Sequence, residues 1–151
     1  MTAVGKLVVL NPGEGTRWQI GPDSFRTKGS AKERSESFSV IEYEGAPGVP
    51  GPPAHAHRTF EEAWYILEGE VRFESSGKSI VGKEGTYLYV PKGVPHRFEV
   101  QGTAPARWVG IFSPGRFVAL IEELAAIIPA NGPPDPKKIV ALFSKYDTEL
   151  V

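Results

Sequence analysis

The chain has 151 residues, a formal net charge of −1 at pH 7 and no cysteine. This length suits one domain with one core, and the balanced, scattered charge argues against nucleic acid and anionic membranes as partners. The lack of cysteine excludes disulfides and thiolate ligands, so any metal would be held by nitrogen and oxygen donors. The apolar runs are too short for a signal peptide or a membrane span, and we therefore expect a cytoplasmic protein.

Short apolar or alternating runs, separated by glycine and proline, fill about the first 110 residues. Runs of this length with turn residues between them are typical of an antiparallel sandwich or barrel. We therefore predict an all-β fold whose barrel core covers about residues 37–113. The expected strands are Lys6–Leu10, Trp18–Ile20, Ser37–Glu44, Ala63–Leu67, Val71–Ser75, Tyr87–Val90, His96–Val100 and Ala106–Phe112.

A helical repeat replaces the strand pattern in the C-terminal part of the chain. Apolar residues between Phe117 and Ile128 predict a helix at about 114–128, with Ser113 as its N-cap and Pro114 in its first turn. Asp135 followed by Pro136 is a second start signal and predicts a helix at about 136–146. We expect both helices to pack on the outside of the barrel or on a second subunit, so that residues 1–151 form one domain.

All three histidines of the chain fall inside two short patterns. In an extended strand, His55 and His57 point to the same face, which a barrel strand aims at its interior. Glu62 begins a neighbouring strand, and His96 comes from a third strand that follows a turn with two prolines and a glycine. Three neutral imidazoles and one carboxylate would leave a divalent ion with a net charge near +1 and with open positions for a substrate. The patterns therefore predict a reactive metal site.

Strand parity also indicates which side chains share the interior with these ligands. Trp64 and Ile66 lie on the same face as Glu62, and Phe98 shares the parity of His96. We take these three residues as candidates for a substrate pocket. Arg97 alternates to the outer face, where a surface charge is the expected role.

The two patterns resemble the two motifs of the cupin superfamily. The first is His55-Ala-His57-x4-Glu62-x6-Gly69, and the second is Gly85-x5-Pro91-x-Gly93-x2-His96. The chain departs from the motifs at Val49, where a glycine is expected, and at Val100, where an asparagine is expected. Neither departure involves a ligand. The stretch from about Glu42 to Pro114 is similar to the small single-domain cupins related to quercetin dioxygenase.

This resemblance implies a double-stranded β-helix, or jelly-roll barrel, with a C-terminal helical extension. It also implies one divalent transition metal per chain, held by His55, His57, Glu62 and His96, and a homodimer. Imidazole and carboxylate ligands do not choose among Fe, Mn, Ni, Co and Zn. The expected activity is that of a dioxygenase acting on a small enolizable or phenolic substrate, with Glu62 as the catalytic base.

Other interpretations of the same residues stay open. The histidines would be satisfied core residues if no metal binds. Glu61 is an alternative ligand to Glu62, because three or four residues between His57 and the glutamate are both tolerated, but only Glu62 keeps the family spacing to Gly69. A metal-bound site would also serve a redox-neutral lyase, isomerase or cyclase, or a protein that binds a small ligand without turnover. Sugar epimerases of this fold use a histidine base without metal, and here no histidine is left over for that role.

Overall fold

The computed structural model describes residues 6–29 and 35–151 of the chain. This part of the chain contains eleven strands and two helices, neither of which is long and apolar enough to cross a membrane. In chain order the elements are β1 Thr16–Ile20, β2 Asp23–Lys28, β3 Ser39–Gly45, β4 His55–His57, β5 Glu61–Glu68, β6 Val71–Ser75, β7 Lys78–Gly82, β8 Tyr87–Val90, β9 Arg97–Val100, β10 Ala106–Ser113, α1 Phe117–Ile127, α2 Pro136–Lys145 and β11 Thr148–Leu150.

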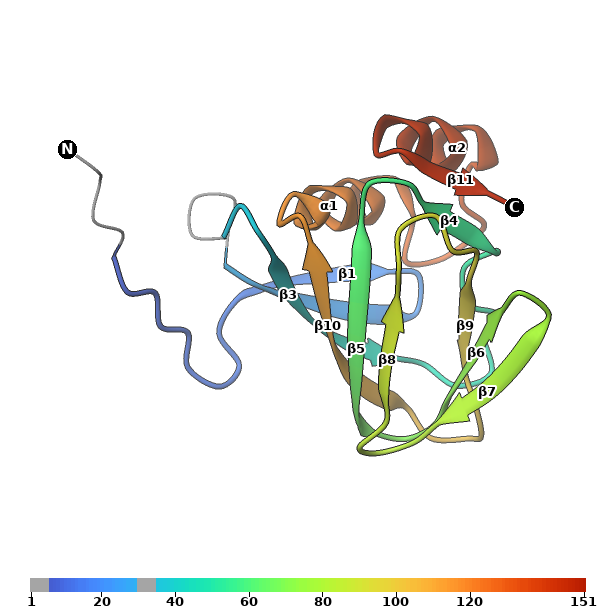
Figure 1. Ribbon diagram of the computed structural model, residues 1–151, viewed down its shortest axis with the longest axis horizontal. Coiled ribbons are helices and arrows are strands. Elements are labelled where there is room, and N and C mark those ends of the chain that lie inside the picture. Colours follow the sequence, from blue (N-terminus) through green and yellow to red (C-terminus); the bar gives the residue numbers. More distant parts are fainter. Residues whose placement is uncertain (1–5, 30–34) are drawn as a thin grey trace.

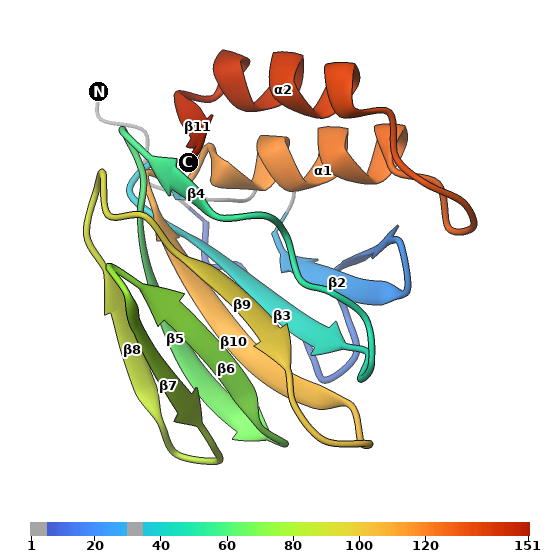
Figure 2. The same cartoon turned by 90° about the vertical axis from the view of Figure 1, so that its right-hand side faces the viewer.

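The strands form two antiparallel layers (Figures 1 and 2). The larger layer is a six-stranded sheet with the order β1-β2-β3-β10-β5-β8. The smaller layer consists of β7-β6-β9 and β11-β4, which are joined by a bridge between His55 and His96. The all-β jelly-roll fold with a C-terminal helical extension, expected from the sequence, is confirmed.

Aromatic side chains from inward strand positions fill the space between the layers. Tyr43, Trp64 and Trp108 of the larger layer stack on one another, with ring centroids 5.1 to 5.5 Å apart. Phe73 and Phe98 of the smaller layer meet Trp64 edge-on, at 5.2 and 4.7 Å. Such pairs contribute roughly 0.5–1.5 kcal/mol each beyond the burial of their area. This core holds β5 firmly, and β5 carries Glu62.

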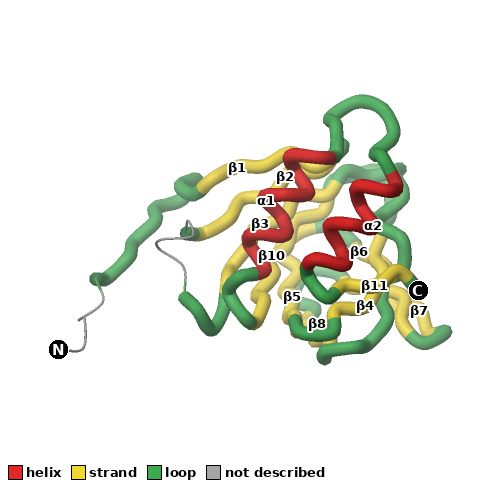
Figure 3. Tube along the Cα trace, turned by 90° about the horizontal axis from the view of Figure 1, so that it is seen from above, coloured by secondary structure: helices red, strands yellow, loops and turns green. Residues whose placement is uncertain are grey.

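The two helices lie next to each other across one end of the barrel (Figure 3). Helix α2 begins as predicted, because Asp135 is its N-cap and accepts a hydrogen bond from the backbone N–H of Lys137. The predicted cap of α1 is wrong. Its N-cap is Arg116, and Ser113 is still part of β10, where it pairs with Glu61.

The predicted strand Lys6–Leu10 is also wrong. These residues carry no strand, Leu7 is 90% exposed, and the segment runs away from the barrel (Figure 1). The run is apolar but does not alternate, so it lacks the one-sided pattern that pairs a strand with a sheet and covers one of its faces. Conversely, β2, β7 and β11 form although they are not among the expected strands.

Candidate metal centre

The four predicted ligands lie together at the end of the barrel that the helices cover. His55 and His57 come from β4, Glu62 is the second residue of β5, and His96 directly precedes β9. All four are buried, with 4 to 6% of their surface exposed. The ligand nitrogens of the three histidines lie within 4.8 Å of one another, and Glu62 Oε1 lies 2.7 Å from His96 Nε2. The three-histidine cluster is able to bind a metal ion.

The backbone around β4 brings the ligand segments together. The amide of His55 donates to the carbonyl of His96 at 3.0 Å, and the amide of His96 donates to the carbonyl of His55 at 2.9 Å. Upstream of β4, a Cβ atom at Gly51 would lie 1.6 Å from the carbonyl oxygen of Phe98. Only glycine therefore allows the chain to pass this close to β9 on its way to the first ligand.

Two of the imidazoles are oriented by carbonyl groups close to them in the sequence. The Nδ1 atom of His55 lies 2.9 Å from the carbonyl oxygen of Pro53, and that of His96 lies 2.9 Å from the carbonyl oxygen of Val94. Because a carbonyl oxygen can only accept, both Nδ1 atoms carry the proton. In the neutral form of each ring, Nε2 then presents a lone pair, as a metal ligand must.

His57 is oriented differently. Its Nδ1 atom lies 2.7 Å from Oγ1 of Thr148 in β11, 91 residues further along the chain. Thr148 is 4% exposed and belongs to the centre, although the sequence patterns did not single it out. A threonine in a short polar stretch has no spacing that links it to a histidine so far away.

Two facing atoms of the centre lack hydrogen-bond partners. Glu62 Oε1 and His96 Nε2 are fully buried, and their 2.7 Å approach does not have hydrogen-bond geometry. Leaving buried polar atoms unpaired costs about 1–3 kcal/mol each. A cation between a carboxylate oxygen and imidazole nitrogens would satisfy both atoms. These four residues therefore fit a divalent transition metal.

The protonation states also suit metal binding. Burial lowers the pKa of His57 to about 4, and burial together with the charge of His96 lowers the pKa of His55. Burial acts to raise the pKa of Glu62, but the contact with His96 and the neighbouring imidazoles outweigh it and lower this pKa. In His96, burial is outweighed by the contact with Glu62, which raises the pKa. Two neutral imidazoles and an ionised carboxylate are thus in place at neutral pH.

Glu61 and Arg97, which directly adjoin the candidate ligands Glu62 and His96 in the sequence, have side chains on the outer face of the barrel. Glu61 lies on the outer face of β5, where it accepts a hydrogen bond from the hydroxyl of Tyr89 at 2.9 Å. Arg97 lies outside and forms an ion pair with Glu74 at 3.3 Å. Of the two glutamates, therefore, Glu62 is the one that lies against His96.

Aromatic side chains close the centre on the side of the helices. Phe117 of α1 meets the ring of His57 edge-on at 5.5 Å, and Phe143 of α2 lies 6.0 Å from the ring of His55. Both phenylalanines are buried. The helical extension thus forms an apolar wall next to the ligands, which excludes water and strengthens electrostatic interactions inside the site.

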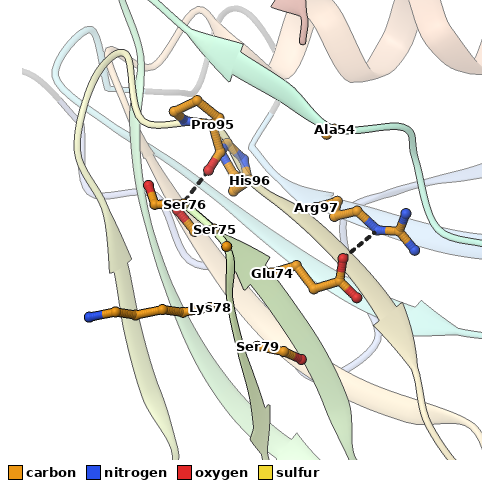
Figure 4. A pocket seen from close by; sticks show the side chains of 10 residues that line it. Ala54, Glu74, Ser75, Ser76, Lys78, Ser79, Pro95, His96 and Arg97 are labelled. Atoms are coloured by element: carbon orange, nitrogen blue, oxygen red, sulfur yellow. Dashed lines mark hydrogen bonds and ion pairs between the residues drawn. The ribbon is translucent and has the colours of Figure 1, made fainter.

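A surface pocket of about 300 Å³ reaches His96 from outside the smaller layer (Figure 4). Its wall includes the turn between β6 and β7, where the hydroxyl of Ser75 donates to the carbonyl of Pro95 at 2.7 Å. The three candidates for substrate contact lie deeper. Trp64 and Ile66 belong to the buried core, and Phe98 packs against it. Whether they contact a substrate stays a prediction.

Comparisons with known proteins find a match to the cupin domain in the part of the chain that contains the candidate ligands. The model of the cupin domain matches residues 42–112, a stretch that contains all four ligands. A germin-like protein of Arabidopsis thaliana, subfamily 2 member 1, is 32% identical over 113 residues, which are 70% of this chain and 48% of the relative. The chain thus spans about half the length of this curated relative.

Solved structures share the fold. A predicted oxalate decarboxylase from Thermotoga maritima superposes with a TM-score of 0.62 at 20% identity, covering 71% of this chain and 99% of its own. The polyketide cyclase RemF from Streptomyces resistomycificus gives a TM-score of 0.61 at 20% identity, covering 72% and 80%. At these identities the likeness concerns the fold alone.

Proposed function

We propose that the chain, which matches the cupin domain over residues 42–112, is a metal-dependent cupin dioxygenase acting on a small enolizable or phenolic substrate. One observation carries this proposal: Glu62 Oε1 and His96 Nε2 face each other, fully buried and without hydrogen-bond partners, beside two further imidazoles. This donor set suits Fe, Mn, Ni, Co or Zn. The relation to quercetin dioxygenases, which the motifs suggest, is part of the same proposal.

The residues of the centre have two roles in this proposal, which are to bind the ion and to accept a proton from the substrate. His55, His57 and His96 hold the ion with Glu62, and a bound divalent ion supplies Lewis acidity toward a substrate oxygen. Glu62 is the general base, because its ionised carboxylate can accept the proton that an enolizable or phenolic substrate loses. Dioxygen is the oxidant in this reaction, and both of its atoms enter the product.

Trp64 is the residue we propose to orient the substrate. Its indole Nε1 is fully buried and has no hydrogen-bond partner, although buried polar groups are normally paired. Trp64 shares the inner face of β5 with Glu62, so its N–H can donate to a substrate oxygen near the ligands. Ile66 and Phe98 would then supply apolar walls.

The second candidate is a redox-neutral lyase, isomerase or cyclase that uses the same four residues. It is favoured by the shared fold of the polyketide cyclase and the predicted oxalate decarboxylase. In this reaction the substrate would be polarised and deprotonated in the same way, but no dioxygen would be consumed. Turnover with and without oxygen therefore separates the two candidates.

The deciding experiment combines metal analysis with oxygen uptake. Metal content is measured by mass spectrometry on protein purified without a metal-affinity tag, for the wild type, His57→Ala and the outer-face control Glu61→Gln. About one redox-active ion per chain, lost only in His57→Ala, together with oxygen uptake on a flavonol or a 1,3-diketone, supports the dioxygenase. Turnover without oxygen uptake supports the second candidate. A protein that stays free of metal after reconstitution contradicts both and leaves a small-ligand binder.

We also propose that two copies of the chain associate through the outer face of β5, β8 and β10. This tyrosine face consists of Tyr65, Leu67, Tyr87, Tyr89 and Ile111, which are 40 to 66% exposed. An aromatic side chain carries about 150–250 Å² of surface, so the three half-exposed rings present roughly 300 Å² together. That is a large part of the roughly 800 Å² that each partner of a standard interface buries. A second copy suits this largely apolar face, because a two-fold axis places it against itself and Glu61, the carboxylate on this side of β5, is paired with the hydroxyl of Tyr89.

Light scattering after size exclusion tests this assembly. The wild type should have the mass of a dimer, and Tyr87→Glu should have the mass of a monomer because it buries a charge in the interface. Val140→Glu, at an exposed apolar position of α2 outside the tyrosine face, is the matched control and should stay dimeric. A monomeric wild type at micromolar concentration contradicts the proposal.

A further inference from the structure

The three ligand histidines differ in how their rings are held. His55 and His96 each bond a carbonyl two residues upstream, at Pro53 and Val94, so the local backbone orients these two rings. The ring of His57 depends instead on a side chain from the far end of the chain, Thr148. One ligand out of three therefore relies on the C-terminal strand.

The hydrogen bonds around Thr148 determine which nitrogen of His57 is protonated. A hydroxyl has one proton, and Thr148 donates it to the carbonyl oxygen of Tyr146 at 3.2 Å. Toward His57 the same oxygen must therefore accept, so the proton sits on Nδ1 of His57. Nε2 of His57 then carries the lone pair and faces the other ligands. Since Thr148 is 4% exposed, water has little access to replace it.

The C-terminal segment is attached on both sides of Thr148. Strand β11 pairs with β4 so that Thr148 lies opposite His57 and Leu150 opposite His55. Before β11, the amide of Arg58 donates to the carbonyl of Asp147 at 2.9 Å. After β11, the amide of Val151 donates to the carbonyl of Ala54 at 3.0 Å. These contacts place the hydroxyl of Thr148 against the ring of His57.

The segment that precedes β11 is in turn attached to α1 by two side-chain contacts. The hydroxyl of Tyr146 donates to Glu123 of α1 at 2.6 Å, and Lys145 at the end of α2 forms an ion pair with the same carboxylate at 2.7 Å. Tyr146 is buried, and its carbonyl is the group that receives the proton of Thr148. The position of Thr148 is thus set by the packing of α1, α2 and β11 on one another.

We propose that Thr148 is a positioning residue of the metal centre, which keeps His57 in the tautomer that presents Nε2 to the ion. In this proposal α1, α2 and β11 contribute to metal binding by positioning Thr148, in addition to shielding the centre from solvent. Partners of this kind around metal ligands typically change metal affinity by about 10 to 100-fold when they are removed. The proposal rests on metal binding at the three histidines, but the tautomer itself is a property of the metal-free protein.

The test uses the full chain and the pair Thr148→Val and Thr148→Ser. Valine has nearly the shape of threonine without the hydroxyl, whereas serine keeps the hydroxyl. Affinity for Zn²⁺ and Co²⁺ is measured by competition with a chromophoric chelator. We expect Thr148→Val to lose about 10 to 100-fold in affinity and Thr148→Ser to stay close to the wild type. Wild-type affinity in a folded Thr148→Val overturns the proposal.

A spectroscopic signature distinguishes positioning from general support. In the metal-free protein, ¹⁵N shifts of the His57 ring, assigned with His57→Gln, should show a protonated Nδ1 in the wild type and in Thr148→Ser. Thr148→Val should show a mixture of tautomers. A protonated Nε2 in the wild type overturns the proposal even if the valine variant does not fold. If no metal binds, this measurement still tests the proposal and only the proposed function fails.

The matched control is Thr59→Val. The hydroxyl of Thr59 contacts Asp147 at 3.3 Å and accepts from Arg116 at 2.8 Å, so this change loosens the attachment of β11 without touching the ring of His57. We expect Thr59→Val to keep the wild-type tautomer and metal affinity. Equal losses in Thr59→Val and Thr148→Val would show that the attachment as a whole matters and would overturn the specific role of Thr148.

Discussion

The two faces of β5 differ in burial and in chemical character, although they alternate along the first seven of its eight residues. The inner residues are Glu62, Trp64 and Ile66, and all are at most 4% exposed. The outer residues are Glu61, Ala63, Tyr65 and Leu67, of which Tyr65 and Leu67 are 50 and 40% exposed. The inner face contributes the candidate ligand Glu62 and part of the core, and the outer face contributes half-exposed apolar surface.

The register of β5 decides which of its side chains face the candidate metal centre and which face outward. Because side chains alternate, a slip of one residue would exchange the two faces and put Glu61 in place of Glu62. From Glu62 to Ile66, each residue of β5 pairs in regular register with β10, and the irregularity in this ladder lies between Arg107 and Trp108. The ligand and its aromatic neighbours therefore lie in the regular part of the strand.

The largest expected effect is a difference in unfolding free energy between substitutions on the inner and outer faces of β5. Ile66→Ala removes a side chain that is 1% exposed and should lower the free energy of unfolding by about 2–5 kcal/mol, because it leaves a cavity. Leu67→Ala, one residue further and on the outer face, should cost less than about 1 kcal/mol in the monomer. Urea unfolding of both variants measures the difference. Similar losses at both positions would mean that the outer face is as tightly packed as the inner one.

The next largest expected effect is a difference in metal affinity between variants of Glu62 and of Glu61. Glu62→Gln keeps the volume of the side chain but removes the charge, and we expect metal affinity to fall by at least about 100-fold, which is more than the loss when a residue that only orients a ligand is removed. Glu61→Gln removes a charge from the outer face and should leave the affinity within about twofold. Chelator competition gives both values. The assignment of Glu62 as ligand fails if the effects are reversed or equal.

The smallest effect uses pH to probe the burial of the ligands. The pKa of His57 is about 4 in the folded chain, below its ordinary value of 6.5. Between these values the unfolded chain binds more protons than the folded chain, so the unfolding free energy falls as pH falls. For His57 alone the loss at pH 5 is roughly 2 kcal/mol. His96 acts in the opposite direction, because its pKa is raised.

Melting temperatures of the metal-free protein at pH 7 and pH 5 measure this effect. The contribution of His57 is isolated by comparing the wild type with His57→Gln, which retains the opposing contribution of His96. The wild type should lose more stability than the variant on acidification. Equal losses would show that His57 is not buried in its neutral form.

The sequence predicted correctly those features that depend only on residues close to one another in the chain, such as strand alternation and helix capping. The period of a strand places His55 and His57 on one face and Glu62 inside, because only neighbouring residues are needed to decide this. The same holds for Asp135 and Pro136 at the start of α2, where cap and first turn are adjacent. The spacing of the two motifs then brings His96 to the same end of the barrel.

The features that were missed depend on contacts distant in sequence. Ser113 has the composition of a helix cap, but its backbone is already paired in β10, so tertiary structure overrides the local signal. Strand β11 has no alternation of its own and forms because β4 offers an edge to pair with. Thr148 therefore acquires its role only in the folded chain, and a single sequence contains no trace of it.

The pairing of β4 with β11 also has a consequence for synthesis of the protein on the ribosome. His57 is translated 91 residues before Thr148, so the barrel strands and the local contacts of His55 and His96 are available well before the last ligand is oriented. A nascent chain that met a metal ion early would hold it with an unfinished centre. The contact that orients the ring of His57 thus forms only after residue 148 has been translated.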